Sequence, residues 1–121
     1  MFNFIKKLFL KETLTGEWLT EDGSGFSMIM GSWIEFKRDG TGSYESWYNG
    51  EESYHLKGSF NWVKTGPFQI KIQESNKDPE IIDYRFQTIH NRTELLNSSG
   101  KVDGKTEFEQ FWNLGQTVFK K

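Results

Sequence analysis

The chain has 121 residues, a formal charge of −2 and no cysteine. This length suits one domain with a single core. Without cysteine there is no disulfide framework, thiol nucleophile or cysteine-ligated metal site, and the slightly acidic balance argues against a nucleic-acid-binding surface. Alanine is absent, whereas there are 11 Phe, 5 Trp and 4 Tyr, a composition that favours strands over helices.

Residues 2–12 differ in pattern from the rest of the chain. Phe2, Ile5 and Leu8 recur at helical spacing, with lysines largely on the other side, which predicts a short amphipathic helix. We expect this helix to pack on the body of the domain, and the alternative is contact with an anionic membrane surface. Lysines interrupt the apolar run and no cleavage site follows, so we expect no signal peptide and a cytoplasmic location.

After Thr15 the spacing becomes alternating, and turn signals such as Asp39-Gly40 and Asn49-Gly50 separate strand-sized intervals. Eight strands are predicted, at 16–20, 27–37, 43–48, 53–63, 68–74, 81–90, 92–98 and 105–114. Each has one apolar and one polar face, which is typical of a one-sided antiparallel sheet.

Closure of such a sheet would bury the apolar face and remove the exposed edges. We therefore predict one all-β domain over residues 1–121. It consists of the helix at 2–12, an up-and-down meander at 16–114 that closes as a barrel, and a C-terminal tail at 115–121. An open sheet covered by the helix is the alternative architecture.

The Gly16-Glu17-Trp18 sequence at the start of the first strand resembles the lipocalin-like (calycin) barrels. The segment 33–42 is similar to a hairpin of small bacterial members of that group. The resemblance implies structural roles for Gly16 and Trp18, with the indole packed across the closed end of the barrel beside a basic residue. The candidates for this residue are Lys120, Lys121 and Arg85.

Candidates for chemistry are few. His55 falls on the polar face of its strand, and His90 ends an apolar face beside a turn. Neither histidine has carboxylates at ligand spacing, so no metal site is expected. Glu107 and Glu109 share the exposed face of one strand, where their pKa values would not be driven apart for acid–base catalysis. We expect no catalytic residue, no cofactor and a non-enzymatic protein.

The predicted interior consists of bulky side chains interrupted by a few polar ones. Its apolar members are Trp18, Met28, Met30, Ile34, Phe36, Tyr44, Tyr48, Tyr54, Leu56, Phe60, Trp62, Phe68, Ile70, Ile72, Ile82, Tyr84, Phe86, Leu95, Phe108 and Trp112, and its polar members are Ser32, Ser46, Thr88 and Gln110. An eight-stranded barrel is either filled by side chains or holds one small ligand. The number of rings and the absence of alanine favour a filled barrel.

Two functions remain open. The first is a cytosolic protein-partner module of the toxin-immunity type, with Trp33 and Trp47 on the outer face and the acidic hairpin residues Glu51 and Glu52 as the contact surface. The outer face also carries Phe111 by alternation, and the alternative is that the N-terminal helix covers such residues. The second function is a carrier of a small apolar ligand inside the barrel. Its ligand-binding candidates are Tyr44, Tyr54, Tyr84, His90 and Gln110.

Overall fold

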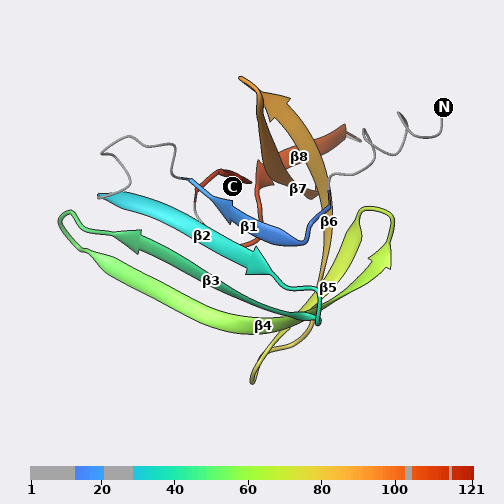
Figure 1. The fold of residues 1–121 in the computed structure, drawn as a ribbon, viewed down its shortest axis with the longest axis horizontal. Helices are drawn as coiled ribbons and strands as arrows, with labels where there is room; N and C mark the ends of the chain where they lie inside the picture. The colour runs from blue at the N-terminus through green and yellow to red at the C-terminus, as the bar shows by residue number, and fades with distance from the viewer. Residues whose placement is uncertain (1–12, 21–28, 103–104, 115) are drawn as a thin grey trace.

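Nine β-strands account for the regular structure of the described residues (Figure 1). The computed structural model describes residues 13–20, 29–102, 105–114 and 116–121. The strands are β1 (Gly16–Leu19), β2 (Met30–Phe36), β3 (Thr41–Tyr48), β4 (Tyr54–Gly66), β5 (Gln69–Glu74), β6 (Glu80–Ile89), β7 (Arg92–Val102), β8 (Lys105–Gln110) and β9 (Val118–Lys120). The helix predicted at 2–12 lies outside the described residues.

The strands form a closed antiparallel barrel, which confirms the predicted all-β barrel architecture. Strands β1 to β6 pair in sequence order, and β6 pairs with β7. β9 lies between β7 and β1, so eight strands complete the ring. β8 is outside this ring and pairs only with β7 among the described strands.

The role of β9 corrects the prediction of a tail at 115–121. Trp18 pairs with Lys120 and Leu19 with Phe119, while on its other side β9 pairs with Glu94 and Leu95 of β7. In a simple up-and-down barrel the predicted strand at 105–114 would have closed the ring. β9 closes the ring instead, by pairing with β1 and β7. Its Val118 is fully buried, so this short strand also contributes to the core.

Most residues that alternation assigned to the interior form the core. The buried apolar residues are Leu14, Trp18, Ile34, Phe36, Phe60, Ile70, Ile72, Ile82, Tyr84, Leu95, Phe111, Leu114 and Val118. Their rings meet edge to face, as Phe36 does with both Phe60 and Trp62 at 5.4 Å between ring centroids. Such pairs add to the stability gained from burying apolar area.

β4 explains two of the exceptions because it is longer than the barrel wall. Residues 54–61 pair with β3, but pairing with β5 begins only at Phe60. The first half of β4 therefore extends past the barrel together with β3 (Figure 1). Tyr54 and Leu56, predicted as interior residues, are exposed for this reason. Met28, also predicted as interior, lies outside the described residues.

The second half of the chain holds the other corrections, among them Thr88 on β6 and Gln110 on β8, which are exposed although alternation placed them inside. Phe68, which precedes β5, is 43% exposed, and Phe108, on β8 outside the ring, is 54% exposed. Phe111 is fully buried although alternation placed it outside. The alternation fails there because β8 ends at Gln110 and the chain then turns.

Candidate functional site

Residues 111–114, here called the interior turn, occupy the space in which a carrier would hold its ligand. Phe111 and Leu114 are fully buried, and the Phe111 ring lies edge-on to Phe36 with centroids 5.9 Å apart. Both residues belong to the same cluster as the inward side chains of the barrel strands. The core at this level of the barrel is therefore filled by the chain itself.

Two buried serines hold the interior turn in place. Ser32 on β2 and Ser46 on β3 are opposite each other in the sheet. Their hydroxyls donate to the carbonyl oxygen of Leu114 over 2.6 and 2.8 Å, and the two Oγ atoms are 3.0 Å apart. Sequence reasoning placed these serines in the interior, and their function is to satisfy a buried carbonyl rather than a ligand.

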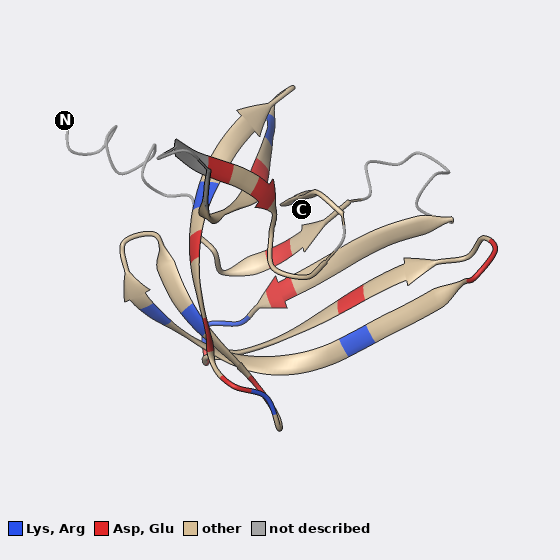
Figure 2. Cartoon of the chain, turned by 180° about the vertical axis from the view of Figure 1, so that it is seen from behind, with Lys and Arg blue, Asp and Glu red and all other residues tan. Residues whose placement is uncertain are grey.

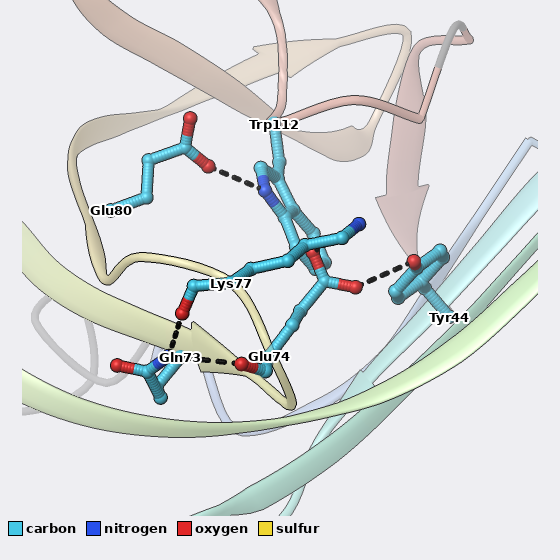
Figure 3. A network of polar contacts seen from close by, with 6 residues as sticks. All are labelled: Tyr44, Gln73, Glu74, Lys77, Glu80 and Trp112. Carbon is cyan, nitrogen blue, oxygen red and sulfur yellow. Dashed lines mark hydrogen bonds and ion pairs between the residues drawn. The ribbon is translucent and has the colours of Figure 1, made fainter.

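Trp112 covers the neighbouring end of the barrel. Its ring lies edge-on to Tyr44 at 4.8 Å and to Phe60 at 5.1 Å, and its Nε1 donates to the Glu80 carboxylate over 2.7 Å (Figure 3). Its backbone φ is +52°, a conformation that side-chain-bearing residues seldom adopt. These contacts with two rings and a carboxylate compensate for the unfavourable backbone conformation.

Tyr44 is tied into the same network. Its hydroxyl donates to Glu74 Oε1 over 2.7 Å, and Lys77 Nζ lies 3.3 Å from the other carboxylate oxygen of Glu74 (Figure 3). Burial, followed by the hydrogen bond to Glu74 and its negative charge, raises the pKa of Tyr44 to about 12. Tyr44 thus stays protonated and anchors the β5–β6 hairpin instead of facing an empty interior.

The remaining carrier candidates do not converge. Tyr54 and Gln110 are exposed on different strands. His90 and Asn91 form the β6–β7 turn with φ values of +49° and +64°, as a two-residue type I′ hairpin requires, and His90 is exposed. Tyr84 is buried at the opposite end of the barrel from the interior turn, beside a cavity of about 310 Å³.

The four partner candidates lie on and around the projecting β3–β4 hairpin. Trp33 is on β2 and Trp47 is on β3, where they lie diagonally across the outer face of the sheet. Both side chains are half-buried. Trp33 Nε1 donates to Glu17 Oε1 over 3.0 Å, and the Trp47 indole lies against Gly31. Glu51 and Glu52 are exposed in the turn at the tip of the hairpin (Figure 2).

The hydrogen bond from Trp33, together with Lys121, affects the ionisation of Glu17. Lys121 Nζ lies 3.2 Å from Glu17 Oε2. The bond from Trp33 and then that from Lys121 hold the pKa of the Glu17 carboxyl below its ordinary value. Trp33 is therefore engaged with its own domain through its indole nitrogen and is otherwise half-buried.

Trp18 closes the end of the barrel opposite the interior turn. Its ring stacks on Phe86 with centroids 5.5 Å apart, and its Nε1 donates to the Leu14 carbonyl over 2.9 Å. Lys120 Nζ lies 4.8 Å from the Trp18 ring centroid and donates to the Thr15 carbonyl. Of the three basic candidates, Lys120 is thus the one that packs on Trp18.

Sequence reasoning missed the interior turn and β9. The available signals were weak: Asn113 as a turn residue after a supposed strand, and the three-residue apolar–aromatic–basic sequence 118–120. Among the described residues, no group of three His, Asp or Glu side chains could hold a metal ion. The described residues include no helix long and apolar enough to cross a membrane.

Comparison with known proteins gives no match: no family model, curated protein or solved structure resembles the chain significantly.

Proposed function

We propose that the protein is a non-enzymatic, cytoplasmic protein-binding module of the toxin-immunity type. The observation that carries this proposal is the interior turn, which fills the barrel with Phe111 and Leu114. A barrel filled by its own chain has no room at that level for a carried molecule, so the outside of the domain is the better candidate for recognition.

The surface that we propose for the partner is the outer face and tip of the β3–β4 hairpin. Trp33 and Trp47 supply large, partly exposed aromatic area, and aromatic residues are the commonest energetic centres of protein interfaces. Glu51 and Glu52 add negative charge at the tip. Such a surface would favour a basic partner and would speed its association by electrostatic steering.

A second candidate function, the carriage of a small apolar molecule, has one supporting observation. The cavity of about 310 Å³ at the Trp18 end is bordered by Trp62, Phe68, Tyr84 and Phe86. Tyr84 is only 2% exposed, and its hydroxyl has no hydrogen-bond partner among the described residues. Thr13, Thr15 and Lys64 also border this pocket, and an aromatic pocket with a few polar groups is a reasonable site for a small ligand.

Native mass spectrometry of the full chain purified from its own host tests the two functions against each other. We expect a stoichiometric protein partner and no bound lipid or other small molecule. Glu51→Lys and Glu52→Lys should reduce recovery of the partner, whereas Asp78→Lys, an exposed acid on the β5–β6 hairpin, should not. A small molecule at one copy per chain, with no protein partner, would favour the carrier and refute the proposal.

A further inference from the structure

Two strand edges of the barrel lack a neighbour. Residues 54–59 of β4 pair only with β3, and β8 pairs only with β7, within the part of the chain that the structure describes. The two edges lie on opposite sides of the molecule (Figure 1). An unpaired edge offers backbone N–H and C=O groups to another strand.

The side chains along these two edges are complementary. On β4, Tyr54 and Leu56 alternate with His55 and Lys57; on β8, Phe108 and Gln110 alternate with Glu107 and Glu109. Leu56 is 55% exposed and Phe108 is 54% exposed, the two highest values among the exposed large hydrophobic residues. The β4 edge thus carries exposed apolar side chains, the cation Lys57, and a histidine whose Nε2 is hydrogen-bonded to Glu45 of the same hairpin. The β8 edge carries an exposed apolar side chain and two acids (Figure 2).

We propose that β4 of one copy of this chain pairs antiparallel with β8 of a second copy. A single register places Leu56 opposite Phe108, Lys57 opposite Glu107 and His55 opposite Glu109. Directly opposed apolar and oppositely charged pairs each stabilise an antiparallel ladder by about 0.2–1 kcal/mol. All three pairs form together because Leu56 lies between His55 and Lys57 on one edge and Phe108 lies between Glu107 and Glu109 on the other.

Charge excludes the symmetric alternatives. Pairing β8 with a second β8 sets the carboxylates of Glu107 and Glu109 against one another. Pairing β4 with a second β4 gives Lys57 no acidic neighbour within the edge, because residues 54–59 contain no carboxylate. The contact is therefore head-to-tail, and it either closes into a ring or continues as a filament.

Sedimentation equilibrium of the full chain tests this proposal. The weight-average mass should rise above the 14.2 kDa of one chain as the protein concentration increases. Added salt should weaken the association because the charged pair of Lys57 with Glu107 contributes to it. A mass that remains that of one chain at millimolar concentration would overturn the proposal.

Two charge-swapped proteins show whether these edges are responsible. The first carries Glu107→Lys and Glu109→Lys. The second carries His55→Glu and Lys57→Glu, with Glu45→Lys to preserve opposite charges within the β3–β4 hairpin, where Glu45 faces Lys57. Each protein alone should associate about tenfold or more weakly than the wild type. Circular dichroism and thermal unfolding establish that both variants are folded.

An equimolar mixture of the two swapped proteins is the decisive step. Each then meets a partner whose edge carries the opposite charge, so association should return to the wild-type level. Failure of the mixture to associate, or unchanged association of either swapped protein alone, would show that another surface is responsible. Sedimentation uses the purified chain with no other protein present, so its outcome does not depend on the partner proposed for the outer face and tip of the hairpin.

Discussion

Single residues tie together parts of the chain that are distant in sequence. Trp18 contacts Leu14, Phe86 and Lys120, and Lys120 in turn donates to the carbonyls of Thr13 and Thr15. The two ends of the described chain thereby meet over one indole ring. Ser32 and Ser46 do the same at the other end of the barrel, where they bind Leu114.

Trp18→Ala should lower the free energy of unfolding by about 3–5 kcal/mol, because it empties a fully buried site that the surrounding strands cannot refill. Urea denaturation followed by circular dichroism measures this. Trp33→Ala, at a half-buried site, should cost less. A loss below about 1 kcal/mol for Trp18→Ala would contradict its place in the core.

Ser32→Ala and Ser46→Ala should show strong coupling. Either change alone leaves the Leu114 carbonyl one hydroxyl partner, whereas both together leave it buried without one, at a cost of about 1–3 kcal/mol. In a double-mutant cycle, the double variant should therefore lose more free energy of unfolding than the two single variants lose together. Strict additivity would mean that the serines do not share this carbonyl.

Trp33→Phe should raise the pKa of Glu17, because the hydrogen bond from the indole is the largest cause of its lowered value. A group with a lowered pKa in the folded state stabilises the fold above its ordinary pKa, and the contribution is lost as the pH falls through the folded value. Glu17→Gln should accordingly remove part of the loss of stability in acid. NMR titration of the Glu17 side chain measures the shift, and an unchanged pKa in Trp33→Phe would be inconsistent with the bond.

The strands show how far local pattern determines this fold. Eight strands could be predicted because alternation and Asp-Gly or Asn-Gly turns are local features of the chain. β9 could not be predicted, since Val118–Lys120 is too short to show a period and becomes a strand only between β1 and β7. The burial of Phe111 was missed because alternation was extended past Gln110, where the strand ends. Tyr54 and Leu56 were misplaced because the length of β5, a distant element, decides how much of β4 is covered.

Closure of the barrel by β9 can be tested with an engineered disulfide, since the chain has no cysteine of its own. Leu19 and Phe119 are directly opposed partners across β1 and β9, so their Cα atoms should be about 4.5–5.5 Å apart. Leu19→Cys with Phe119→Cys should oxidise readily to an intramolecular disulfide.

Leu19→Cys with Glu45→Cys is the matched control. Glu45 is on the same outer face but two strands away, across Trp33, at about 10 Å and beyond disulfide reach. Thiol counting under mild oxidation distinguishes the two pairs. Equal reactivity of both would argue that β9 is not fixed beside β1.

At the scale of the whole molecule, the barrel is a packed core, and the recognition surfaces that we propose lie on its outside. One end is closed by Trp18 and Lys120, and the other is filled by the interior turn under Trp112. The β3–β4 hairpin extends beyond this body and carries the acidic tip and one of the two unpaired edges. Because the interior is packed and the β3–β4 strand pair extends outside it, we propose that the protein binds a partner.

The position of the interior turn is the claim on which this account depends most. A nuclear Overhauser spectrum of the isotope-labelled full chain tests it directly. We expect cross-peaks between the rings of Phe111 and Phe36, and from Leu114 to Ser32 and Ser46. If these cross-peaks are absent and Leu114 instead gives the sharp signals of a mobile, solvated side chain, the barrel is not filled by its own chain and the carrier function becomes the better explanation.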